Sequence, residues 1–253
     1  MIESLLQALE AALEPGLAIA MGATFLAGIV RGFSGFGAAM VQAPIFAILF
    51  TAPQAVATVV ALGMLASMQL LPGSIRDTAW RDILPIGLTA ALTIPLGAYV
   101  LLAIEADVMR RGISAMVLVT VLFLMSGFRY PGRPGLRGGL FTGGLSGVIN
   151  GATSVGGPPV VIYMLAGPNT ATINRASLIT FYTGLNGLTL LSLVVNGVVS
   201  YATVARVLWL LPAQIVSLLV GTWLFHRATD VIYRRIAMGL LLAIALIGLF
   251  YTR

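Results

Sequence analysis

Apolar runs of about 20 residues recur along the whole chain, and a helix of that length crosses the ~30 Å hydrocarbon core of a bilayer. Hydrophobic residues make up 59% of the 253 residues and charged residues only 9%. A soluble domain is about a quarter charged. The strands of an outer-membrane barrel alternate over segments of about 10 residues, a pattern that the long apolar runs do not follow. The sequence therefore predicts an all-α integral membrane protein.

Glycine and proline interrupt two of these apolar runs. The first contains Arg31-Gly-Phe-Ser-Gly-Phe-Gly37 and continues to Pro44. The second, residues 138–167, contains Asn150-Gly-Ala-Thr-Ser154 and then Gly156-Gly157-Pro158-Pro159. Both residue types weaken helices, and broken backbone at membrane depth is tolerated only where protein or a water-filled cavity satisfies it. Interrupted segments in matching halves indicate a transporter's binding site, formed by re-entrant hairpins or by pairs of short spans.

The two interrupted segments belong to an internal duplication. A shift of 115 residues places Gly28 on Gly143, Gly32 on Gly147 and Pro44 on Pro159, and later matches follow with small insertions. We therefore expect two repeats, residues 17–127 and 139–253, joined by a Pro/Gly-rich connection at 128–138. Each repeat has an interrupted segment and three transmembrane helices, and residues 1–16 form an interfacial segment with an acidic start.

The arginines indicate how the repeats are oriented. If each interrupted segment crosses the membrane once, the repeats are parallel and the arginines outside the spans divide seven to six between the two faces. If each crosses an even number of times, the repeats are inverted and the division becomes nine to four. Positive charge accumulates on one side of membrane proteins, so the census favours inverted repeats with both termini outside.

The composition also excludes several classes of chemistry. All 14 basic residues are arginine, so a P-loop lysine is missing, and cysteine is absent. His226 is the single histidine, and the eight acidic residues fall in predicted loops, at span ends or near the N-terminus. We therefore expect no metal, no cofactor, no nucleic-acid partner and no proton relay at depth. An intramembrane enzyme would need a nucleophile with its base, or metal ligands, within the spans.

The repeated glycine clusters, each leading into proline, together with Thr153-Ser-Val-Gly-Gly-Pro-Pro159, resemble the TauE/SafE family of sulfite and organosulfonate exporters. The resemblance extends from about Ala18 to Phe250. It implies a permease of the bacterial cytoplasmic (inner) membrane that moves small sulfur-containing anions such as sulfite, sulfoacetate or sulfolactate. The motif specifies the family better than the substrate, and Arg31 adds a charge that the cluster does not require.

An anion could bind where the helices break. A broken helix presents free N–H groups with about half a positive charge, and nearby hydroxyls and amides add donors. Arg31 lies inside a predicted membrane segment, where an anion is its natural partner. Alternatively, the hydroxyls bond their own backbone, Arg31 extends to the headgroups and Arg175 only marks orientation. The candidate substrate-binding residues are Arg31, Ser34, Gly35, Gly37, Gln42, Asn150, Gly151, Thr153, Ser154, Gly156, Gly157, Arg175, Thr183 and Asn186.

The sequence therefore predicts a permease that exports a small oxyanion held near the midplane between the repeats. Its expected partners are the anionic substrate, membrane lipid and, as an option, a second copy of the chain. A potential of 100 mV, inside negative, favours outward anion movement by about 2.3 kcal/mol per charge, so export needs no coupled ion. The alternatives are a channel-like anion pore, a carrier of another small anion such as a carboxylate, and, less favoured, an intramembrane enzyme.

Overall fold

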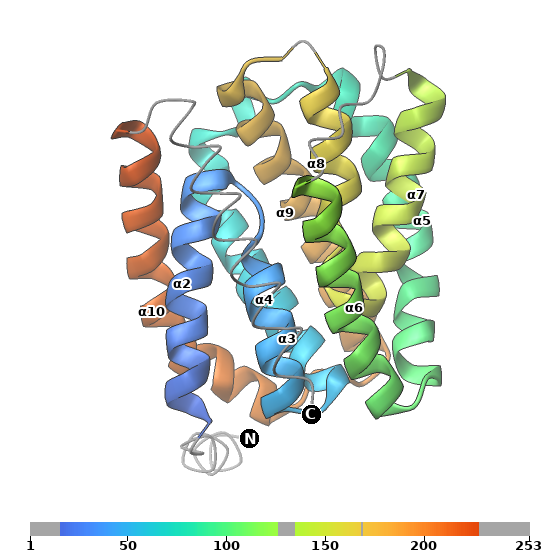
Figure 1. Ribbon diagram of the computed structural model, residues 1–253, viewed down its shortest axis with the longest axis vertical. Coiled ribbons are helices and arrows are strands. Elements are labelled where there is room, and N and C mark those ends of the chain that lie inside the picture. Colours follow the sequence, from blue (N-terminus) through green and yellow to red (C-terminus); the bar gives the residue numbers. More distant parts are fainter. Residues whose placement is uncertain (1–15, 126–134, 168, 228–253) are drawn as a thin grey trace.

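The computed structural model describes residues 16–125, 135–167 and 169–227, and within these ranges every regular element is a helix (Figure 1). Residues 1–15 of the predicted interfacial segment, residues 128–134 of the predicted connection and the last transmembrane helix predicted for the second repeat lie outside the described residues. The helices are α2 Leu17–Ser34, α3 Ala38–Leu49, α4 Ala52–Leu70, α5 Trp80–Ala103, α6 Ala106–Met125, α7 Leu136–Thr153, α8 Gly157–Ala166, α9 Ala171–Val195 and α10 Tyr201–Arg227, with the short 3-10 turns η1 Leu71–Gly73 and η2 Ile75–Asp77 between α4 and α5.

The predicted all-helical fold is confirmed across the described residues. Five helices are long and apolar enough to cross a membrane, namely α2, α4 with η1, α5, α9 and α10. Large apolar side chains are exposed along these helices, Leu92 at 80% and Val195 at 77% among them. Outward-facing apolar side chains of this kind are expected where the surrounding solvent is lipid. The chain is therefore a multi-pass membrane protein by helix length and composition.

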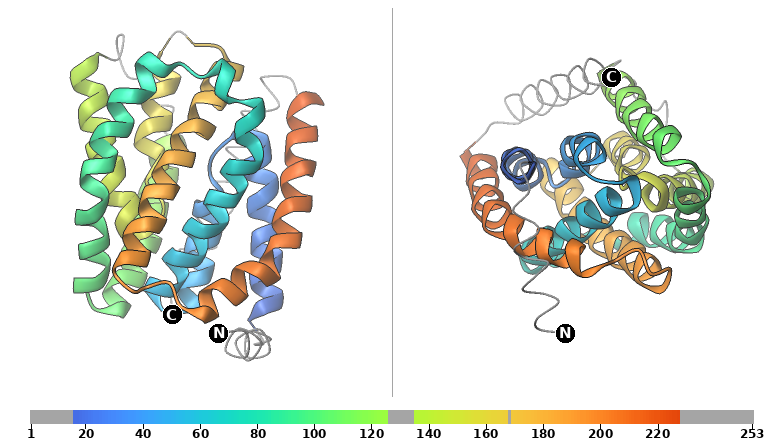
Figure 2. Two further views of the ribbon diagram at one scale, coloured as in Figure 1. Left: turned by 180° about the vertical axis from the view of Figure 1, so that it is seen from behind. Right: turned by 90° about the horizontal axis from the view of Figure 1, so that it is seen from below.

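Two helix pairs fold back on themselves from opposite ends of the molecule. In Figure 1, α2 ascends and α3 descends, whereas α7 descends and α8 ascends. The next helices continue this opposition, because α4 ascends to a connection at the top of the view while α9 descends to one at the bottom (Figures 1 and 2). The turns of both pairs are inside the protein, since residues 31–38 and 150–158 are all buried. Neither turn is therefore exposed to the surrounding lipid.

Three helix starts recur at a constant distance along the chain, whereas the start of α10 follows that of α5 by 121 residues. Leu17, Ala38 and Ala52 begin α2, α3 and α4, and each is followed 119 residues later by the first residue of α7 (Leu136), α8 (Gly157) or α9 (Ala171). The first and second helix pairs begin with 18-residue helices, α2 and α7. This distance is four residues longer than the 115 that the sequence comparison suggests. Counted from these helix starts, Gly28 and Gly32 lie at the same helix positions as Gly147 and Gly151, whereas the sequence comparison pairs them with Gly143 and Gly147.

Each 18-residue helix packs closely on a long helix at glycine. A Cβ added to Gly32 of α2 would lie 3.0 Å from the Cα of Gly221 in α10, and one added to Gly151 of α7 would lie 3.0 Å from the Cα of Gly97 in α5. Small residues spaced by four allow backbones to approach in this way. The α2–α10 and α5–α7 contacts therefore support the two hairpins from the sides. α10 also bends along its length and contains Pro212, a usual cause of a kink (Figure 2).

Candidate functional site

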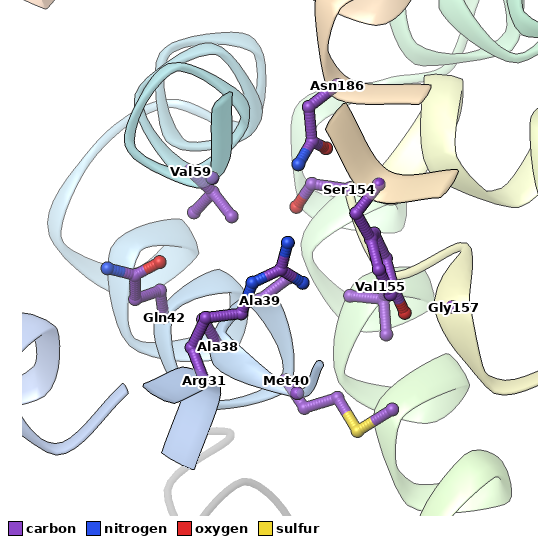
Figure 3. Close-up of a pocket in the computed structure, with 13 residues that line it drawn as sticks. Arg31, Ala38, Ala39, Met40, Gln42, Val59, Ser154, Val155, Gly157 and Asn186 are labelled. Carbon is purple, nitrogen blue, oxygen red and sulfur yellow. The ribbon is translucent and has the colours of Figure 1, made fainter. Parts of the chain in front are cut away.

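A cavity of about 410 Å³, counting its mouth, lies where the two buried turns meet α4 and α9 (Figure 3). The residues that line it are Arg31, Gly37, Ala38, Ala39, Met40, Gln42, Val59, Gly63, Ser154, Val155, Gly157, Tyr182 and Asn186. The first turn contributes more of this wall than the second.

The first turn forms because two glycines adopt left-handed backbone. Gly35 has φ 79° and Gly37 has φ 88°, a region that is costly for residues with a Cβ. The Gly35 N–H closes α2 by donating to the Arg31 carbonyl at 2.8 Å. The Ser34 hydroxyl stays within the turn, where its Oγ accepts from the Phe36 N–H at 3.2 Å and lies 2.7 Å from the Val30 carbonyl oxygen. The chain then restarts as α3, whose first turn faces the cavity.

The first turn of α3 supplies main-chain donors. Ala38 and Ala39 are its first two residues, and both line the cavity. The first N–H groups of a helix have no acceptor within it, and they carry the positive end of the helix dipole. Among the described residues, neither of these two N–H groups has a hydrogen bond outside α3. The α3 terminus therefore presents donors and partial positive charge to the cavity.

Arg31 brings a full positive charge to the same cavity. Its side chain is only 3% exposed, and in Figure 3 the guanidinium extends towards Ser154 and Asn186. One terminal nitrogen donates to the Ser67 hydroxyl at 2.5 Å, whereas Nε has no hydrogen-bond partner in the described part of the chain. The guanidinium carbon lies 4.5 Å from the centroid of the Tyr182 ring, within cation–π range. Arg31 therefore does not extend to the headgroups.

The described wall of the cavity contains no negative charge. None of its lining residues is a carboxylate or a histidine, and the ion pair found among the described residues is the surface pair Arg110–Asp107. Groups of three or more potential metal ligands are likewise not found there. The arrangement is therefore suited to holding an anion, because a buried cation and a helix N-terminus act together without a protein counter-charge.

The second turn offers fewer donors than the first. Ser154 takes the left-handed position with φ 61°, and its hydroxyl donates to the Thr153 carbonyl at 2.5 Å. The Val155 N–H donates to the Thr153 hydroxyl at 3.2 Å and the Gly156 N–H to the Asn150 side-chain oxygen at 3.3 Å. Pro158 and Pro159, at the start of α8, have no N–H at all. The two turns are thus chemically unequal, although both were expected to present free donors.

The polar residues around the second turn hold the turn itself. The Asn150 side-chain amide also donates to the Thr189 hydroxyl of α9 at 2.9 Å, and the Ser146 hydroxyl donates to the Gly156 carbonyl. The Thr153 hydroxyl donates to the Ile149 carbonyl at 2.8 Å. These bonds satisfy backbone groups that the helix break would otherwise leave buried without partners. Asn150 therefore links α7, the turn and α9, and its side-chain amide is engaged at both ends.

The structure brings six of the sequence-predicted residues to the cavity wall: Arg31, Gly37, Gln42, Ser154, Gly157 and Asn186. Eight others lie outside the wall: Ser34, Gly35, Asn150, Gly151, Thr153, Gly156, Arg175 and Thr183. Most of these eight shape the turns or the helix contacts described above. The Thr183 hydroxyl donates to the Ile179 carbonyl at 2.9 Å in its own helix, whereas Asn186, three residues further along α9, reaches the cavity.

Arg175 supports the first turn from outside the cavity. Its terminal nitrogen donates to the Gly32 carbonyl at 2.6 Å, and its guanidinium carbon lies 4.3 Å from the Phe225 ring centroid. Gly32 is in the last turn of α2, where free carbonyls and the negative end of the helix dipole favour a cation. Arg175 therefore stabilises the C-terminal end of α2, the element that holds Arg31.

Tyr182 is a wall residue outside the set predicted from sequence. It lies one helical turn before Asn186 on α9, is 6% exposed, and packs its hydroxyl so closely on Gly157 that a Cβ there would collide with it. The helical spacing to Asn186 was the available signal. Gly63 of α4 was also not predicted, and it leaves room for the Asn186 amide, which would lie 2.8 Å from an added Cβ.

Gln42 connects the wall to a buried polar group between α2, α3 and α10. Its amide nitrogen lies 3.4 Å from the Thr24 hydroxyl and 3.5 Å from the Gln214 side-chain oxygen. The Gln42 oxygen and the Gln214 nitrogen have no partner among the described residues. Long bonds and unsatisfied atoms of this kind are typical of a site that binds water.

Comparison with known families gives one match, to the family model described as Sulfite exporter TauE/SafE, over residues 20–247. The match includes every described residue that lines the cavity and all of the two helix hairpins except the first three residues of α2. Comparisons with curated proteins and with solved structures gave no match.

Proposed function

The chain belongs to the sulfite exporter TauE/SafE family, and from that premise we propose that it is a membrane permease for small sulfur oxyanions, with sulfite as the first substrate to test. Membership of a transporter family is consistent with a protein that is not an enzyme. We propose the cytoplasmic (inner) membrane as its location and organosulfonates as further substrates.

One observation carries the assignment of the site: Arg31 is a deeply buried cation without a carboxylate partner among the described residues. A charge that is buried and unpaired costs several kcal/mol, roughly, even after the protein relaxes around it. Such residues in membrane segments mark substrate pathways. A bound oxyanion would offset that cost. Anion binding therefore explains why a charge is buried here, and helix packing alone does not.

We propose that the anion lies between Arg31 and the start of α3. Nε of Arg31 and the Ala38 and Ala39 N–H groups provide donors on one side, and the Asn186 amide lies on the other. Charge-assisted hydrogen bonds of this kind are about twice as strong as neutral ones.

We further propose that the two hairpins are the central parts of inverted repeats. The support comes from the 119-residue recurrence of helix starts and from the opposite directions of α2–α3 and α7–α8 in Figure 1. Rocking of one repeat against the other around a fixed central site is the usual route to alternating access. The cavity between the hairpins is the site that such a motion would expose to either side.

Flux measurements in liposomes test this proposal. Purified protein should carry labelled sulfite at a rate that saturates with concentration and is competed by unlabelled sulfite, because a carrier has one site per cycle. The Arg31→Gln variant should lose most of this flux, while Arg111→Gln, which changes an exposed arginine, should retain it. Flux that rises linearly without saturation would indicate a pore, and equal flux in the Arg31 variant would move the site elsewhere.

A further inference from the structure

We propose that the protein works as an anion exchanger: the site at Arg31 does not cross the membrane empty, and a small inorganic anion takes the place of the exported one. This inference rests on the proposed function and adds its mode of operation. The returning anion is defined by its chemistry as small, monovalent and weakly hydrated compared with sulfite, and chloride is the probe.

The electrostatics of the empty cavity motivate the proposal. Arg31 and the N-terminal end of α3 both place positive charge at the same wall, and none of the described lining residues is negatively charged. Within the described part of the chain, the guanidinium contacts two neutral groups, the Ser67 hydroxyl at 2.5 Å and the Tyr182 ring, whose centroid lies 4.5 Å away. A neutral acceptor and a ring face lower the cost of a buried cation without neutralising it.

This cost matters most when the site faces neither side of the membrane. While the cavity is open, water solvates Arg31 and the unpaired charge is tolerable. During the switch between sides, water access is lost and the charge interacts more strongly because the local dielectric falls. An anion in the cavity removes that penalty, whereas an empty cavity bears all of it. The loaded protein should therefore switch sides much faster than the empty protein.

The remaining donors indicate what the returning anion needs to be. The Ala38 and Ala39 N–H groups and the Asn186 amide belong to neutral groups, and none of them demands a planar or bidentate acceptor. A spherical anion can therefore satisfy Arg31 in the same space as an oxyanion. Exchange of a divalent sulfite for one chloride moves one net negative charge outward, so an inside-negative potential still drives export.

Two tracer measurements on the wild-type protein test exchange. Liposomes loaded with labelled sulfite, with potassium and valinomycin holding the potential at zero, are diluted into chloride or into gluconate of equal ionic strength. We expect efflux into chloride to be about tenfold faster or more, because a small part of the penalty for an unpaired charge raises the switching barrier by that factor. Labelled chloride should likewise enter chloride-loaded liposomes and not gluconate-loaded ones.

The outcomes separate exchange from the proposed function. Equal sulfite efflux into chloride and gluconate would overturn exchange and leave sulfite transport standing. Chloride exchange that sulfite fails to compete would support the exchange mode and contradict sulfite as substrate. In the Arg31→Gln variant, any flux that remains should no longer depend on the anion outside, because the neutral site can cross empty; Arg111→Gln should behave as wild type. Chloride dependence that survives in Arg31→Gln would also overturn the proposal.

Discussion

The guanidinium carbon of Arg31 lies 4.5 Å from the centroid of the Tyr182 ring, so the buried cation of α2 rests on an aromatic face supplied by α9. The ring is in turn fixed by its close contact with Gly157 at the start of α8. Elements from both halves of the chain thereby set the position of one charge. A substitution in either half of the chain that moves one of these contacts should therefore alter the anion site.

Replacing Tyr182 tests whether the ring holds Arg31. Tyr182→Leu should lower the stability of the anion-free protein by about 0.5–2 kcal/mol, because the desolvated cation loses its aromatic partner. Tyr182→Phe keeps the ring and should lie much closer to wild type. Thermal unfolding of the purified protein in detergent would measure both. A leucine variant as stable as the phenylalanine variant would show that the ring contact contributes nothing.

Asn150 and Asn186 have the same side chain but should differ in their roles. Asn150→Ala should cost about 1–3 kcal/mol of stability, because it leaves the buried Gly156 N–H without its acceptor. Asn186→Ala should change stability little and weaken sulfite binding, because its side chain lies in the cavity wall and has no hydrogen bond to the described residues. Unfolding curves with and without sulfite separate the effects. If Asn186→Ala lowered stability and Asn150→Ala weakened sulfite binding, the two roles would have to be exchanged.

Glycine should be required at Gly37 in the first turn but not at Gly22 in the helix before it. Gly37→Ala should destabilise the protein by about 1–2 kcal/mol, since its φ of 88° is unfavourable for an L residue with a Cβ. Gly22→Ala in α2 is the matched control, because no atom lies within 4 Å of an added Cβ there. That control should be neutral or stabilising by up to about 1 kcal/mol. Equal effects at both positions would argue against strain at the turn.

Cysteine labelling tests the inverted arrangement. Arg76 lies between α4 and α5 and Asn196 between α9 and α10, both are exposed, and the wild-type chain has no cysteine. These two connections lie at opposite ends of the molecule in Figure 2. Cysteines introduced singly at the two positions should react with an impermeant reagent from opposite sides of the membrane. Reaction of both from one side would establish parallel repeats.

The helical fold could be predicted because lipid demands it. In long apolar runs the surrounding lipid offers no hydrogen-bond partners, so the backbone satisfies its hydrogen bonds within helices. Glycine and proline also fixed the neighbourhood of the first turn, since α2 ends and α3 begins within the predicted segment. The correspondence between the halves was harder, because Gly143, Gly147 and Gly151 form a ladder with a four-residue period. Gly28 and Gly32 can be aligned with Gly143 and Gly147 or with Gly147 and Gly151. The helix starts in the structure favour the second alignment.

The site could be predicted in part. Arg31 was predictable because a charge in an apolar run needs a partner. Asn150 and Thr153 lie next to a break as expected, but short polar side chains there can bond either a ligand or the backbone, and sequence does not distinguish the two. Arg175 is similar, because its role depends on the distance between α9 and the end of α2. Such distances between helices are set by tertiary packing.

Anion binding by the purified protein tests the central claim most directly. Sulfite at 100 times its dissociation constant should stabilise the wild-type protein by about 2.7 kcal/mol, measured by thermal unfolding in detergent with gluconate as the background anion. The Arg31→Gln variant should bind about 10–100 times more weakly, because a hydrogen bond to a charged group is lost, whereas Arg111→Gln should match wild type. Equal stabilisation of wild type and Arg31→Gln by sulfite would contradict the assignment of Arg31 as the anion-binding residue.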